Sequence, residues 1–171
     1  MKKILIVLAL GGAAMLAGTI KTNAQLLSNG GSSKYQKDLP GDQNTISPKA
    51  IRGFAKKYRD VNSESWIQVK DGFSARFNSD GIDNSILYDK KGKWAGSIKS
   101  YSEDKLPLEI RHIVKSVYYD YKIVHIQEIE TLDSRGTPTY IVFLEDKISL
   151  KMVRIFDGEM KPWKDFKKSI Y

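Results

Sequence analysis

Short runs of alternating apolar and polar residues, separated by turn residues, constrain the fold of this chain most. Asp71-Gly72 is a strong hairpin-turn signal, and the segments 78–81, 89–92 and 133–136 each end in glycine. The strand-like runs lie at 66–70, 73–77, 85–88, 94–101, 123–132, 139–144, 150–156 and 163–166. Short strands joined by Gly and Asp turns predict antiparallel meanders.

Two similar helix openings precede these groups of strands. Pro48–Lys56 reads PKAIRGFAK and Pro107–Lys115 reads PLEIRHIVK. Proline suits the first helical position, where its missing N–H costs nothing, and Ser47 is a candidate N-cap for the first helix. We expect the first helix to end near Asp60, and the second to carry an apolar stripe as far as Tyr121.

The order of one helix and then three or four strands therefore occurs twice. Tyr88-Asp89 and Trp94 in the first half have counterparts of the same type, in the same order, at Phe156-Asp157 and Trp163. This agreement predicts a true repeat. The predicted fold is α+β, with two tandem repeats of one helix followed by a three- to four-stranded antiparallel sheet. The repeats span 47–103 and 104–171.

The first 24 residues have the pattern of an export signal. Lys2 and Lys3 precede the apolar run 4–10, and Ala24 offers a cleavage point. An uncleaved membrane anchor is the alternative, although the apolar run is shorter than the roughly 20 residues that a span needs. Residues 25–46 are rich in Gly, Ser, Asn and Asp and predict a flexible lead. We expect a periplasmic or secreted chain that has no transmembrane segment after cleavage and no nucleic-acid partner.

The chain contains no cysteine, which excludes disulfides, thiolate metal sites and a thiol nucleophile. The formal net charge is +8, and it falls to +5 when the three lysines of the predicted signal are removed. A mild positive balance favours acidic partners or anionic surfaces.

Catalytic and metal motifs are absent from the sequence. His112 and His125 are the only histidines, no serine lies in a G-x-S-x-G motif, and no Gly-rich phosphate loop occurs. Asn78–Asp83 looks superficially like a calcium loop, but it lacks the ligand spacing and reads better as a turn. We predict no catalytic residues, no metal and no cofactor, and therefore not an enzyme.

Aromatic residues offer the clearest binding signal. In the run 139–144, Tyr140 and Val142 point opposite to Ile141 and Phe143, so both sides of this strand are apolar. Either the other repeat covers the second side, or that side binds a partner through Tyr and Trp anchors. The candidate partner-binding residues are Trp66, Trp94, Tyr140 and Trp163. The basic tail at Lys161, Lys164, Lys167 and Lys168 predicts a solvated edge, with contact to an anionic surface as the alternative.

Together these features resemble the PepSY-like proteins of bacterial envelopes, which are grouped by fold with the β-lactamase inhibitor protein. The segments that carry the resemblance are the signal, the two Pro-x-x-Ile openings, SILYDKKGKW and MVRIFDGEMKPW. The resemblance covers about Ser47 to Phe166. It implies a helix-plus-four-stranded-sheet fold and inhibition or binding of envelope enzymes, and it implies no catalytic residues. The β-lactamase inhibitor protein carries disulfides, which this chain lacks.

The sequence thus predicts an exported, non-enzymatic binding protein. Its predicted partner is a protein of the cell envelope, held through an open sheet face. The alternative is a small-ligand or envelope-surface binding protein, in which the aromatic residues line a cleft between the repeats. A small hydrolase would need an acid–base pair that the sequence does not show.

Overall fold

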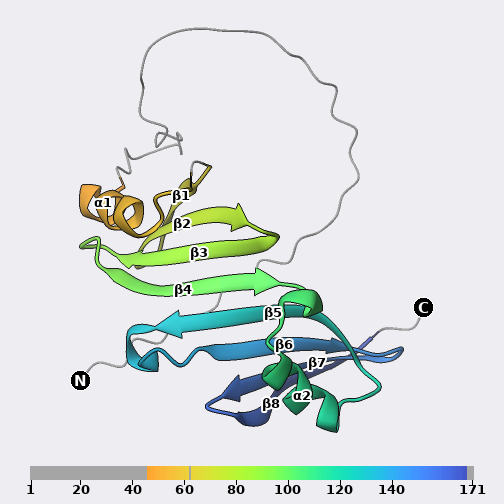
Figure 1. Ribbon diagram of the computed structural model, residues 1–171. Coiled ribbons are helices and arrows are strands. Elements are labelled where there is room, and N and C mark those ends of the chain that lie inside the picture. The colour runs from red at the N-terminus through yellow and green to blue at the C-terminus, as the bar shows by residue number, and fades with distance from the viewer. Residues whose placement is uncertain (1–45, 62, 169–171) are drawn as a thin grey trace, which may run out of the picture. The chain divides into compact units, whose positions relative to one another are not determined.

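The computed structural model describes residues 46–61 and 63–168 (Figure 1). The predicted signal at 1–24 and the lead at 25–46, apart from Ile46, lie outside the described residues, so both stay predictions. The elements in chain order are α1 (Pro48–Lys57), β1 (Ser65–Val69), β2 (Gly72–Ser79), β3 (Ile82–Asp89), β4 (Trp94–Tyr101), η1 (Glu103–Lys105), α2 (Leu108–Val117), β5 (Lys122–Thr131), η2 (Leu132–Ser134), β6 (Thr139–Glu145), β7 (Ser149–Phe156) and β8 (Glu159–Lys167).

Both helices begin where their prolines predict. Pro48 is the first residue of α1, whereas Pro107 is the N-cap of α2. Each helix ends earlier than we expected. Tyr58 and Tyr118 leave helical geometry, and their N–H groups close the last turns on Phe54 and Val114. Tyr58, Tyr118 and Tyr121 follow these ends at helical spacing, so the sequence predicted longer helices than the structure shows.

The β3–β4 turn shows how the hairpins are fixed. Asp89 Oδ1 accepts hydrogen bonds from the N–H groups of Lys91 and Lys93, at 2.9 and 2.8 Å. Gly92 adopts a φ of +72°, and a Cβ there would lie 2.8 Å from the backbone nitrogen of Ala50. The turn is therefore packed directly against the start of α1, which only glycine permits.

The predicted fold of two tandem repeats, each with one helix and its own three- to four-stranded sheet, is wrong. All eight strands form one antiparallel sheet in the order β1-β2-β3-β4-β5-β6-β7-β8 (Figure 1). The joint is the β4–β5 pairing, which runs from Gly96 opposite Thr131 to Tyr101 opposite Ile126. Turn signals mark strands that follow each other directly, and β4 and β5 are separated by α2. Pairing them removes two open edges, each with unpaired N–H and C=O groups.

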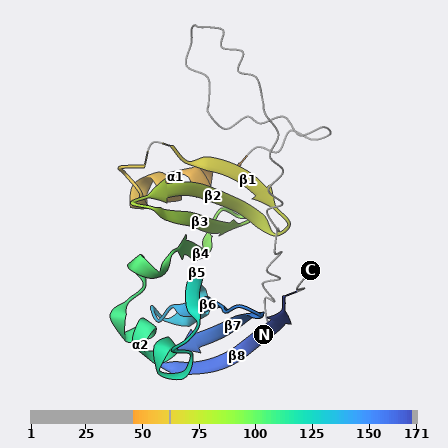
Figure 2. The same cartoon turned by 90° about the vertical axis from the view of Figure 1, so that its right-hand side faces the viewer.

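Both helices lie on one side of this sheet (Figures 1 and 2). Ala50 and Phe54 of α1 pack on Ala75, Phe77 and Ile86, whereas Ile110 and Val114 of α2 pack on a second cluster from β5, β6 and β7. In the described chain, the fully buried members of the second cluster are Val114, Ile126, Val142, Leu144, Val153 and Ile155. The apolar core therefore lies between the sheet and its two helices.

Neither helix in the described part of the chain has the length and apolar character needed to cross a membrane.

Candidate binding face

The side of the sheet that faces away from α1 and α2 is called the open face here. Trp66 contacts Phe54 of α1, so its neighbour Ile67 points to the opposite side. The register places Ile67 opposite Ser74, and Ser74 opposite Leu87. Further along, Ile98 of β4 lies opposite Ile129 of β5 on the same side.

A band of apolar side chains crosses the open face. It comprises Ile67, Leu87, Ile98, Ile129, Ile141, Phe143 and Met152. These residues come from β1 and from each strand from β3 to β7. Ile141 and Met152 are buried, and the others are partly exposed. β2 contributes Ser74, whose buried hydroxyl has no hydrogen-bond partner among the described residues. Neither α1 nor α2 lies over this apolar centre, and a sheet surface of this kind is suited to contact with another protein.

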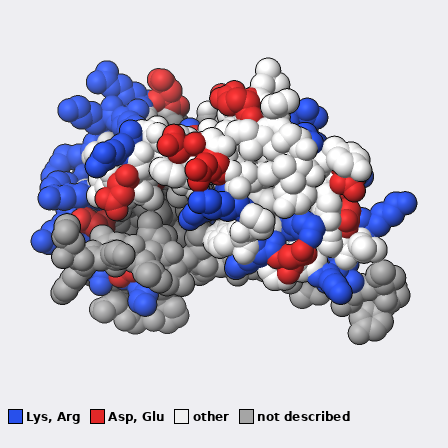
Figure 3. Space-filling model, turned by 90° about the horizontal axis from the view of Figure 1, so that it is seen from below, with Lys and Arg blue, Asp and Glu red and all other residues white. Residues whose placement is uncertain are grey.

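Polar side chains flank this band. Arg76 of β2 lies opposite Ser85, and Arg154 of β7 lies opposite Ile141 and Lys161. Figure 3 shows that charges of both signs are interspersed with uncharged side chains over much of the surface in that view. The open face thus has an apolar centre with polar margins, as protein interfaces have.

His125 lies on the open face beside Phe143, with 5.2 Å between the ring centroids. Burial lowers the pKa of His125 below its usual value of 6.5, and the nearby carboxylate of Asp83 opposes this shift. The imidazole is therefore protonated less readily than that of a free histidine. Its surroundings favour packing against a partner over carrying charge.

The clearest group of ionisable residues lies on the helix side. Glu128 accepts hydrogen bonds from Lys99 at 2.7 Å and from the hydroxyl of Tyr101 at 2.9 Å. Burial and the Glu128 carboxylate raise the pKa of Tyr101. These groups satisfy one another, which is what a structural network does. In the described part of the chain, no three His, Asp or Glu side chains are grouped to hold a metal ion.

Three of the four predicted anchors lie on the helix side, and two of them are Trp66 and Tyr140. Trp66 packs against Phe54 and Tyr88, each at 5.6 Å between ring centroids. Tyr140 packs against the cluster that includes Val114 of α2. Both side chains are half-buried, and they belong to different clusters of the core.

The other two predicted anchors are further apart in the sheet. Trp94, the first residue of β4, is half-buried beside α1, and the ammonium of Lys57 lies 5.5 Å from its ring centroid. Trp163 lies in β8 at a register shift against β7 and is 42% exposed. The structure does not gather the four residues into one patch, and their role in binding stays a prediction.

The open-face band consists of residues that the sequence did not single out as anchors. Ile141 and Phe143 occupy the side opposite to Tyr140, and Ile67 occupies the side opposite to Trp66. The signal was present in the alternation of these strands. Only the position of the helices shows which side is left open.

Comparison with known proteins identifies the fold. No protein-family model matches the chain, and neither does any curated protein sequence. A DUF2874 family protein from Bacteroides ovatus matches with a TM-score of 0.60 and 17% identity, over 74% of this chain and 89% of that chain. A BLIP-like protein from Bacteroides fragilis matches with a TM-score of 0.57 and 14% identity, over 74% and 89%. A predicted periplasmic protein from Bacteroides eggerthii matches with a TM-score of 0.59 and 12% identity, over 72% and 90%.

These likenesses concern the fold alone, because all three identities are low. They support the part of the resemblance that concerns the β-lactamase inhibitor protein, since this chain has a BLIP-like fold. The PepSY-like part of the resemblance stays a prediction.

Proposed function

We propose that this chain is an exported, non-enzymatic binding protein that covers a protein of the cell envelope with the open face of its sheet. The observation that carries the proposal is the apolar band from Ile67 to Met152, over which no helix of the described chain lies. Five members of the band, Ile67, Leu87, Ile98, Ile129 and Phe143, are partly exposed, and exposed apolar groups gathered on one face mark interaction sites.

Two comparisons support the compartment and the mode of action. One structural relative is a predicted periplasmic protein, and another is named for its likeness to an inhibitor protein. A periplasmic location agrees with the predicted signal at 1–24. Occlusion needs no reacting groups on the chain itself, so it does not depend on a catalytic group on the open face.

An affinity experiment tests the proposal. The chain from Gln25 to Tyr171 is immobilised, envelope extract from the source organism is passed over it, and proteins retained at high salt are identified. The experiment is repeated with Ile98→Lys and Phe143→Ser, which alter the centre of the band. Leu108→Lys is the matched control, because Leu108 is 81% exposed on α2.

We expect one retained protein whose Kd weakens about tenfold or more with either open-face variant and stays unchanged with the control. If that protein is a hydrolase, the wild-type chain should also slow its turnover. Equal retention by all variants, or retention at low salt only, would reject the open face as the interface. Circular dichroism spectra establish that each variant is folded.

A hydrolysis assay with a purified β-lactamase tests the narrower inhibitor hypothesis. Inhibition that Ile98→Lys abolishes would identify a β-lactamase as a target. The absence of inhibition would direct the search to other envelope proteins, and retention of those proteins would decide the broader proposal.

A further inference from the structure

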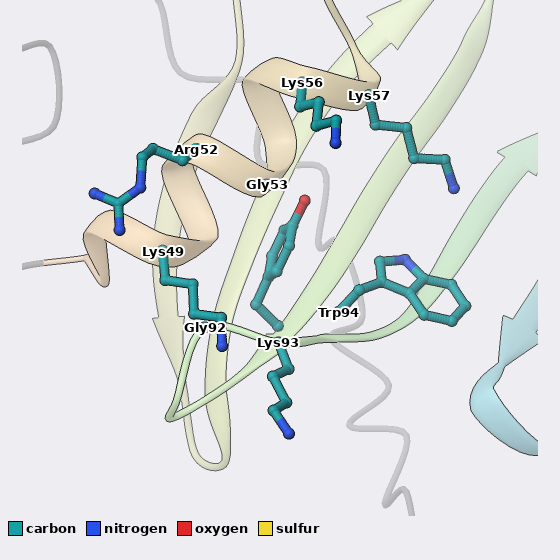
Figure 4. Close-up of a pocket in the computed structure, with 9 residues that line it drawn as sticks. Lys49, Arg52, Gly53, Lys56, Lys57, Gly92, Lys93 and Trp94 are labelled. Atoms are coloured by element: carbon teal, nitrogen blue, oxygen red, sulfur yellow. The ribbon is translucent and has the colours of Figure 1, made fainter.

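A hollow beside α1 is separate from the open face. It has a volume of about 490 Å³ and lies between α1 and the β3–β4 hairpin (Figure 4). This volume is within the range of roughly 300 to 1,000 Å³ that is typical of small-molecule sites. Because α1 packs on the helix side of the sheet, the hollow opens on the side opposite to the apolar band.

Cations surround the hollow. Its lining includes five basic side chains and no carboxylate: Lys49, Arg52, Lys56, Lys57 and Lys93. All five are exposed, and none forms an ion pair with another of the described residues. Unpaired charges of one sign at a concave surface raise the local concentration of ions of the opposite sign.

The spacing of α1 produces this arrangement. Lys49, Arg52 and Lys56 are three and four residues apart, so they share one face of the helix. Gly53 lies between them and has no side chain, and a Cβ there would be 3.6 Å from the ring of Tyr88. A glycine inside a helix costs about 0.5 to 1 kcal/mol relative to alanine. Here it brings the Tyr88 ring, which is only 4% exposed, into the lining of the hollow.

The aromatic residues of the hollow offer hydrogen-bond donors. Burial raises the pKa of Tyr88 to about 12, so its hydroxyl keeps its proton. The Nε1–H of Trp94 is buried and has no acceptor among the described residues. Lys57 covers the Trp94 ring and forms no ion pair in the described chain, so a ligand can displace its ammonium.

We infer that the hollow is a binding site for a phosphorylated ligand. The cations hold the phosphate oxygens, and the faces of Tyr88 and Trp94 contact an apolar or ring-shaped part of the same molecule. A phosphate group suits this site because it presents only acceptors and carries up to two charges, matching a lining of donors and cations. A free phosphorylated metabolite and a phosphorylated lipid headgroup share this chemistry.

Calorimetric titration with inorganic pyrophosphate tests the site for a free ligand. Co-sedimentation with vesicles of phosphatidic acid in phosphatidylcholine, against phosphatidylcholine alone, tests it for a lipid headgroup. Arg52→Ala/Lys56→Ala removes two cations from the rim. Gly53→Leu fills the hollow and leaves the charge unchanged. Lys105→Ala/Lys122→Ala is the matched control, because both lysines are exposed and lie outside the hollow, and their replacement removes the same charge.

We expect saturable binding of at least one probe, weakened about tenfold or more by both hollow variants and less than about twofold by the control. Saturation with pyrophosphate indicates a free phosphorylated compound, and saturation with vesicles alone indicates a headgroup. Binding of neither probe would overturn the inference. So would equal weakening by the Lys105→Ala/Lys122→Ala control, which would indicate attraction by net charge, or unchanged binding by folded Gly53→Leu.

Discussion

Replacement of Ile126 by alanine tests the continuity of the sheet. Ile126 lies in β5 with no exposed surface, opposite Tyr101 of β4 and Val142 of β6, and in one cluster with Val114 of α2. Ile→Ala changes at such sites cost about 2 to 5 kcal/mol of the free energy of unfolding, and we take about 3 kcal/mol. At about 4 °C per kcal/mol for a domain of this size, the Tm should fall by roughly 12 °C.

The assay uses tryptophan fluorescence from the first half of the chain. In a Trp163→Phe background, the remaining reporters are Trp66 in β1 and Trp94 in β4. Since β4 pairs with β5, the fluorescence transition should move down with the Tm measured by circular dichroism, in one cooperative step. If circular dichroism shows two steps, and the fluorescence of the first half stays at the parental Tm, the halves unfold independently. The reasoning from one continuous core and sheet would then be refuted.

Two predictions concern pH. The pKa of His125 is lowered in the folded state, so the unfolded state binds the proton more readily and stability should fall as the pH drops from about 7 through 6.5. His125→Gln should reduce the change of the urea midpoint with pH over this window, and His112→Gln, at an exposed site, is the control. An unchanged pH dependence in His125→Gln would contradict the assignment. The second prediction concerns Asp146. Burial raises the pKa of its carboxyl group, but hydrogen bonds from the Ile148 N–H, Tyr121 and Ser149 lower it by more, so the pKa falls to about 2. The contribution of this carboxylate to the free energy of unfolding is complete above the ordinary pKa of 3.8 and is lost as the pH falls through 2. Asp146→Asn should therefore be less stable at pH 7, and its stability should fall less between pH 4 and 2. A variant whose stability falls as steeply as that of the wild type over this range would disprove the prediction.

The sequence predicted the individual strands well because their signals are local. Alternation in the run 73–77 and the turn at Asp71-Gly72 required only neighbouring residues, and β2 extends from Gly72 to Ser79. The fourth run, predicted from Trp94 to Ile98 and continuing toward Tyr101, lies within β4. The pairing of β4 with β5 is not local, because η1 and α2 lie between them. Local turn chemistry could not predict that the two groups of strands form one sheet.

The candidate anchors show a second limit. Trp66 and Tyr140 were chosen by residue type, since aromatic residues are common in interfaces, but the same residues are common in cores. Alternation divided each strand correctly into two sides, with Ile67 opposite to Trp66 and Ile141 opposite to Tyr140. It did not indicate which side the helices cover. That choice depends on how the connections before β1 and β5 cross the sheet.

Part of the cationic hollow could be recognised from the spacing of basic residues in the sequence, although the net charge of the chain does not reveal it. Lys49, Arg52 and Lys56 lie on one helical face, and Lys93 follows a turn that contains Gly92. The helix and the turn are separated by three strands, and only the packing of Gly92 on the start of α1 brings Lys93 to the same hollow. A single net charge for the whole chain cannot reveal such a local excess.

The two proposed sites lie on opposite sides of one sheet, so a variant at one site should leave binding at the other site unchanged. Lys56 belongs to the helix side and Ile98 to the open face. A ligand in the hollow therefore leaves the apolar band free, and a partner on the band leaves the hollow accessible. Arg52→Ala/Lys56→Ala should weaken phosphate binding while partner capture remains, and Ile98→Lys should have the opposite effect. Loss of both activities in either folded variant would mean that the sites are coupled through α1 and the β3–β4 turn, the elements that connect the hollow to the sheet.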